Sequence, residues 1–263
     1  MNLGLQDKVA IVAASSKGLG KAVAKALAME GAKLALCARG ESTLFATAEE
    51  IRANTGVRVL AQTVDVRHAE QVSQFVERTR REFGGVDICV TNAGGPPAKT
   101  FAETTLEDWR AAVELNLMSC IHFAREVLPL MQKQRWGRFI AITSASVKQP
   151  IDRLILSNSI RSAVSGLIKS LANEYAQDNV LVNSVCPGYT LTDRLAQLSE
   201  KMAAAEGVEA SAIQTRWADQ IPLHRLGLPE EFASAVAFLA SERASYITGA
   251  SLAVDGGWIK GIY

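Results

Sequence analysis

Residues 8–20 read KVAIVAASSKGLG, an apolar run that ends in a turn containing two glycines. The run from Lys8 to Ala13 has the small and β-branched side chains of a buried strand. From Gly18 the spacing changes to that of an amphipathic helix, which continues to Glu30 and stops at Gly31. A buried strand that runs directly into a helix predicts the first unit of an α/β fold.

The same alternation of short apolar runs and longer amphipathic runs continues along the chain. Runs typical of strands lie at 33–38, 58–64, 86–91, 138–143, 180–186 and 251–254. Runs with helical periodicity lie at 41–54, 106–134, about 156–176 and 230–240, and a further one follows the strand at 58–64 and ends at about residue 83. Because the strands are apolar throughout, we predict a doubly wound, Rossmann-like parallel sheet with helices on both faces. No linker or repeat interrupts residues 1–263, which predicts a single Rossmann-like domain.

Composition narrows the expected partners and compartment. The chain has 28 Lys and Arg against 27 Asp and Glu, so neither nucleic acid nor a membrane surface is an expected partner. No apolar run approaches the length of a membrane span, and the first residues lack the pattern of a secretory signal. The four cysteines lie in apolar or helical runs without CxxC spacing, and the three histidines are scattered. We therefore expect buried thiols, a cytoplasmic location and no metal site.

The glycine-containing turn has the features of a pyrophosphate site. A turn between a strand and a helix N-terminus presents backbone N–H groups and the positive end of the helix dipole to an anion. A tight strand–helix turn without a ligand is the alternative. The candidate cofactor contacts in this turn are Ala14, Ser16, Lys17, Gly18, Leu19 and Gly20.

The turn resembles the TGxxxGxG motif of the short-chain dehydrogenase/reductase family, with Ala13 and Ala14 in place of its Thr and first Gly. Other segments similar to family motifs follow in order over nearly the whole chain, and the overall pattern resembles 3-oxoacyl-carrier-protein reductases. They are Asp65-Val66, Asn92-Ala93-Gly94, Asn116, Ser144, Pro187-Gly188 with Thr190 and Thr192, and YITGASLAVDGG at 246–257.

The resemblance implies roles for these residues. Asn116 and Ser144 match two members of the family's catalytic tetrad, and the segment 190–226 matches the part that covers the substrate. The family is usually dimeric or tetrameric, so a homo-dimer or homo-tetramer is implied, together with a small-molecule substrate. The residues implied as cofactor contacts are Asp65, Val66, Asn92, Ala93, Gly94, Pro187, Gly188, Thr190 and Thr192.

The end of the second predicted strand favours one nucleotide. It reads Cys37-Ala38-Arg39, without the acid that would accept hydrogen bonds from the ribose hydroxyls of NAD. Arg39 can make forked contacts to a 2′-phosphate, and Lys17 adds a second cation near that position. We therefore expect NADP(H) rather than NAD(H).

Ser157 and Arg161 stand where the family has its catalytic Tyr and Lys. Counted from Ser144, the YxxxK motif of the family becomes SxxxR in this chain. A Ser hydroxyl is less acidic than a phenol and its side chain is shorter, while an Arg stays protonated. We interpret Ser144, Asn116, Ser157 and Arg161 as the lining of a reactive pocket, with Arg161 also contacting the cofactor.

Three functions are consistent with this substitution. The first is an NADP(H)-dependent oxidoreductase for a small or medium carbonyl or alcohol, with a proton supplied by water, by Ser144 with Ser157, or by Tyr189. The second is a catalytically silent dinucleotide-binding sensor or partner subunit, and the third is non-redox chemistry in the same pocket. The apolar residues of the 190–226 segment favour the first, because a cover over the site serves catalysis.

Overall fold

The sheet determines where the site lies. In the computed structural model, which describes residues 2–262, seven parallel strands form one sheet in the order β3-β2-β1-β4-β5-β6-β7. The order therefore reverses between β1 and β4, where open α/β sheets bind their ligands. The strands are β1 (Val9–Ala13), β2 (Lys33–Ala38), β3 (Val59–Thr63), β4 (Ile88–Thr91), β5 (Gly137–Ile142), β6 (Val180–Pro187) and β7 (Ser251–Val254).

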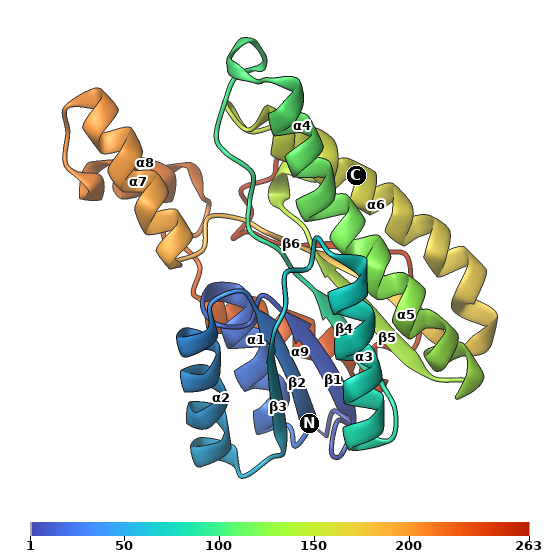
Figure 1. Ribbon diagram of the computed structural model, residues 1–263. Helices are drawn as coiled ribbons and strands as arrows, with labels where there is room; N and C mark the ends of the chain where they lie inside the picture. The colour runs from blue at the N-terminus through green and yellow to red at the C-terminus, as the bar shows by residue number, and fades with distance from the viewer. Residues whose placement is uncertain (1, 263) are drawn as a thin grey trace.

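Helices cover both faces of the sheet, as predicted (Figure 1). One apolar core joins the sheet to α1 (Gly18–Met29), α2 (Glu41–Thr55) and α9 (Pro229–Ala240). The other joins it to α3 (Ala69–Phe83), α5 (Ser119–Lys133) and α6 (Ile155–Tyr175). Along β1, Ala10 and Val12 enter the first core and Ile11 and Ala13 the second. This alternation explains why the strands contain almost no polar residues.

The predicted helix over 106–134 is divided in three. It consists of α4 (Leu106–Ala112), a π-helical turn η2 (Val113–Met118) and α5. The apolar spacing on either side of the turn is helical, so the sequence predicts one continuous helix. Single π-turns inside helices are often found at functional sites, and this one contains Asn116.

The irregular segment 190–226 forms a pair of helices, α7 (Asp193–Glu206) and α8 (Ala210–Gln220). They pack on each other around Ala203, Ile213 and Trp217 and project from the body of the molecule (Figure 1). We call this pair the α7–α8 hairpin. Its two ends meet at a parallel bridge between Thr190 and Gly227. None of the helices in the described part of the chain has the length and apolarity needed to cross a membrane.

Candidate functional site

A cavity of about 580 Å³ opens at the carboxyl ends of β1, β4, β5 and β6, beside the point where the strand order reverses. This position agrees with the sequence prediction of a ligand site at the first strand–helix turn. Most of the predicted site residues line this one cavity. They are Ala14, Ser16, Lys17, Gly18, Leu19, Arg39, Val66, Asn92, Ala93, Gly94, Ser144, Ser157, Arg161, Pro187, Gly188, Thr190 and Thr192.

The first strand–helix turn approaches its own backbone closely. A Cβ atom on Gly20 would lie 2.3 Å from the carbonyl oxygen of Ala14, so this position requires glycine. Lys17 is the N-cap of α1 and makes no side-chain capping hydrogen bond. The N-terminal N–H groups of α1 therefore find no side-chain acceptor at the N-cap position. Ala14 has φ +49°, in the left-handed region that disfavours a Cβ.

Asp65 does not line the cavity, contrary to what its motif implies. Its carboxylate accepts a forked hydrogen bond from Arg67, with Nε–Oδ1 3.0 Å and Nη2–Oδ2 2.5 Å. This hydrogen bond is the main reason that the pKa of Asp65 falls to about 2, and the charge of Arg39 also contributes. The sequence did not predict that Arg67 pairs with Asp65, because the two residues are only two positions apart, in a turn. The adjacent Val66 does line the cavity.

Ser144 and Ser157 both contact Ser146 and not each other. Ser144 is the N-cap of the short helix η3 (Ala145–Val147), and its Oγ accepts a hydrogen bond from the Ser146 N–H at 3.1 Å. The Oγ atoms of Ser157 and Ser146 lie 3.4 Å apart. The Ser144 hydroxyl donates to no residue of the described chain, so its proton is available to a ligand in the cavity.

The Arg161 guanidinium is held by backbone carbonyls. Nη1 donates to the carbonyl oxygens of Ile142 at 3.1 Å and Thr143 at 2.9 Å, and Nη2 donates to that of Ala93 at 3.4 Å. Arg161 is only 8% exposed. Burial, with a smaller contribution from the nearby charge of Arg194, lowers its pKa to about 10. Arg161 therefore ties α6 to the ends of β4 and β5 as a cation without an acidic partner among residues 2–262.

Asn116 does not line the main cavity but contacts the loop after β4, which does. Its Nδ2 donates to the Gly94 carbonyl oxygen at 3.0 Å, which fixes the loop after β4. Its Oδ1 is buried and has no hydrogen-bond partner in the described structure. Asn116 and Arg161 border a second cavity, of about 10 Å³, behind the main one. The motif therefore identified a positioning residue that lies outside the main cavity.

One end of the cavity is aromatic. The Tyr189 ring stacks on Trp217 with centroids 5.1 Å apart and meets Trp258 edge-on at 5.5 Å. Burial raises the pKa of Tyr189, and the negative charge of Asp152 raises it further. Trp258 follows the C-terminal motif and was not predicted. An isolated aromatic residue after two glycines was its only signal in the sequence.

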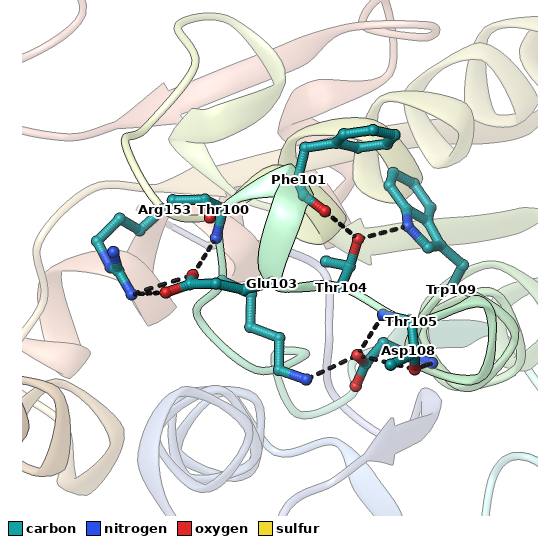
Figure 2. Close-up of polar contacts among 9 residues, drawn as sticks. Thr100, Phe101, Glu103, Thr104, Thr105, Asp108, Trp109 and Arg153 are labelled. Carbon is teal, nitrogen blue, oxygen red and sulfur yellow. Dashed lines mark hydrogen bonds and ion pairs between the residues drawn. The ribbon is translucent and has the colours of Figure 1, made fainter.

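The loop after β4 forms one wall of the cavity and is anchored on its outer side. Gly95 and Pro96 line the cavity. Figure 2 shows that Glu103 joins Thr100 to Arg153, with an Oε2–N distance of 2.7 Å to Thr100 and an Oε1–Nη2 distance of 2.9 Å to Arg153. These contacts fix the wall against the loop that precedes α6.

The described residues contain no group of three or more His, Cys, Asp and Glu placed to hold a metal ion. The four cysteines are free and buried. Burial raises the pKa of the Cys37 thiol to about 12. None of these cysteines is among the residues that line the main cavity.

Comparison with known proteins gives consistent matches over the whole chain. A family model described as enoyl-(acyl carrier protein) reductase matches residues 13–259. The 3-oxoacyl-[acyl-carrier-protein] reductase FabG of Aquifex aeolicus (strain VF5) is 36% identical over 257 residues, covering 98% of this chain and 99% of the relative.

Two solved structures are similar as well. L-sorbose reductase from Gluconobacter frateurii, in complex with NADPH and L-sorbose, has a TM-score of 0.95 and 36% identity, with 100% of both chains covered. A single-residue variant of actinorhodin polyketide ketoreductase, with NADPH, has a TM-score of 0.93 and 32% identity, covering 97% of this chain and 98% of the other.

Proposed function

Because this chain belongs to the short-chain dehydrogenase/reductase family, we propose that it is an NADP(H)-dependent oxidoreductase acting on a small or medium carbonyl compound or the corresponding alcohol. One observation carries this proposal: a single cavity is lined both by the first strand–helix turn and by Ser144. A dinucleotide held at the turn by its pyrophosphate would have Ser144 within the same cavity. Two similar solved proteins are in complex with NADPH, which supports this choice of cofactor.

The residues fit the phosphorylated dinucleotide. Gly20 permits the tight turn between β1 and α1 but does not itself line the cavity, whereas Lys17, Gly18 and Leu19 at the N-terminus of α1 do. Lys17 and Arg39 line the cavity as cations. We assign Arg39 to the 2′-phosphate, because a guanidinium makes forked contacts to that group. Lys17 adds charge at the same end.

The proton is assigned to Ser144 and a water molecule that it binds. When bound, the reduced nicotinamide supplies a hydride to the carbonyl carbon, and the carbonyl oxygen then requires a proton. Ser144 Oγ is fixed by the Ser146 N–H and keeps its own proton free to donate. Tyr189 suits this role less well, because its ring is packed between the side chains of Trp217 and Trp258.

The α7–α8 hairpin is assigned the role of substrate cover. Leu195 and Leu198 of α7 line the cavity from the hairpin side. Closing such a segment excludes water from the reacting groups. This assignment agrees with the position of the substrate-covering segment implied by the sequence.

A catalytically silent dinucleotide-binding protein is the second candidate. The observation that favours it is that Ser157 and Arg161 are both engaged elsewhere, by Ser146 and by three backbone carbonyls. In this case the site would bind NADPH without a side chain suited to proton transfer.

Calorimetric titration with NADPH and NADH, followed by a carbonyl substrate screen, tests the proposal. We expect tighter NADPH binding and NADPH oxidation with at least one carbonyl. Ser144→Ala should then lower kcat about 100-fold, whereas Tyr189→Phe should change it little. Binding of NADPH without turnover of any carbonyl would support the silent binder. Binding of neither nucleotide would contradict both.

A further inference from the structure

Arg194 reaches across the mouth of the cavity. It lies in the first turn of α7, lines the cavity, and donates from Nη2 to the carbonyl oxygen of Pro96 at 3.1 Å. A Cβ on Gly95 would lie 3.7 Å from the same nitrogen. The guanidinium therefore joins the α7–α8 hairpin to the loop after β4, directly above the site.

Arg194 has no acidic partner in the described chain. The neighbouring Asp193 faces Lys17, at 3.8 Å, and Asp152 lies close enough to Tyr189 to affect its titration. The charge of Arg194 acts instead on another cation, Arg161, which also lacks an ion pair.

The residues next to Arg194 connect it with the aromatic end of the cavity. Leu195, the next residue, packs in the cluster that contains Tyr189 and Trp217. Trp258 closes the same end of the cavity. A ligand at this end meets aromatic rings, a guanidinium without an acidic partner and the Ser144 hydroxyl.

We propose that Arg194 binds a carboxylate of the substrate, so that the preferred carbonyl compounds are oxo acids whose apolar part packs against Tyr189 and Trp258. A guanidinium and a carboxylate form forked, charge-assisted hydrogen bonds that orient the bound acid as well as retain it. The hydrogen bond to Pro96 prepositions Arg194 for this contact. The inference rests on the proposed reductase function and names its substrate class.

A carboxylate and its uncharged methyl ester serve as paired probes that test the inference. Reduction of benzoylformate is compared with that of methyl benzoylformate, in the wild type and in Arg194→Gln. We expect the wild type to favour the acid in kcat/KM, and the variant to lower the acid-to-ester ratio at least about tenfold. Ester reduction and the Kd for NADPH should stay within about twofold. Arg194→Lys should recover part of the ratio.

Arg216→Gln is the matched control. Arg216 lies on α8 in the same hairpin, outside the cavity, and pairs with Glu206 at 2.8 Å. It changes the net charge equally, so an equal loss of preference in both variants would overturn the inference. So would a raised Kd for NADPH in Arg194→Gln with an unchanged acid-to-ester ratio, because Arg194 would then bind the cofactor.

Binding of non-reducible analogues separates this inference from the proposed function. Phenylacetate and phenylacetamide are titrated into the NADP⁺-loaded protein. Preference for phenylacetate that is lost in Arg194→Gln supports the carboxylate site even when no carbonyl is reduced. Equal binding of the two, or binding of neither, overturns it, and ester turnover would still support the reductase.

Discussion

Ala14→Gly should stabilise the protein, although most substitutions of a buried or half-buried residue destabilise it. Ala14 has φ +49°, and holding an L-residue in the left-handed region costs about 1–2 kcal/mol. Glycine removes this cost but makes the unfolded chain more flexible, which costs about 0.4–1 kcal/mol. The net expected gain is about 0.5–1 kcal/mol, or an increase in Tm of roughly 1–4 °C for a domain of this size.

Urea unfolding and thermal melting of the nucleotide-free protein measure this gain. The control is Ala13→Gly, one residue earlier, in a fully buried strand position without a positive φ. That change should destabilise by about 1 kcal/mol, because glycine weakens a strand and leaves unfilled space. A loss of stability in Ala14→Gly equal to that in Ala13→Gly would refute the assignment of backbone strain. A lower Kd for NADPH in Ala14→Gly would show in addition that the Cβ crowds the cofactor.

Three further predictions concern charged side chains. Arg39→Gln should raise the Kd for NADPH at least about tenfold and leave that for NADH nearly unchanged, as measured by calorimetry, because it removes a forked phosphate contact; equal weakening of both would contradict the assignment. Arg161→Met should lower the free energy of unfolding by at least about 2 kcal/mol in urea, because buried carbonyls lose their donor; an unchanged midpoint would show that they find other partners. The pKa of Asp65 falls from 3.8 to about 2 on folding, so its stabilisation is complete above about pH 4 and is lost as the pH falls through 2. Arg67→Gln should therefore reduce the loss of stability between pH 5 and pH 2, and an unchanged pH profile would contradict the role of this pair.

The sequence predicted the sheet well because burial on both faces leaves a strong signal. Each strand is an apolar run of the right length, and the predicted bounds of β2 and β7 agree with the structure. The π-turn around Asn116 was missed because the helical spacing resumes after it. A single extra residue in the backbone changes no side-chain class.

The sequence predicted which residues line the cavity better than it predicted the hydrogen bonds that these residues make. Motif order placed Ser144, Ser157 and Arg161 around one cavity, as the structure does. It did not reveal that Arg161 is bound by backbone carbonyls, because carbonyl positions depend on how α6 packs against β5. Arg194 was passed over as well, since its significance depends on which acids are absent from its three-dimensional surroundings.

The parallel bridge between Thr190 and Gly227 pins together the two ends of a long excursion from the body of the protein. The Leu191 N–H donates to the Gly227 carbonyl oxygen at 2.9 Å, and the Gly227 N–H donates to that of Tyr189 at 2.9 Å. Everything between these points is an insert whose entry and exit are fixed independently of its contents. Changes in the length or sequence of this insert leave the strand order unchanged, and they affect the cofactor-binding half only through the residues that line the cavity, such as Thr192. The substrate preference can therefore change through substitution of this one segment, while the sheet stays the same.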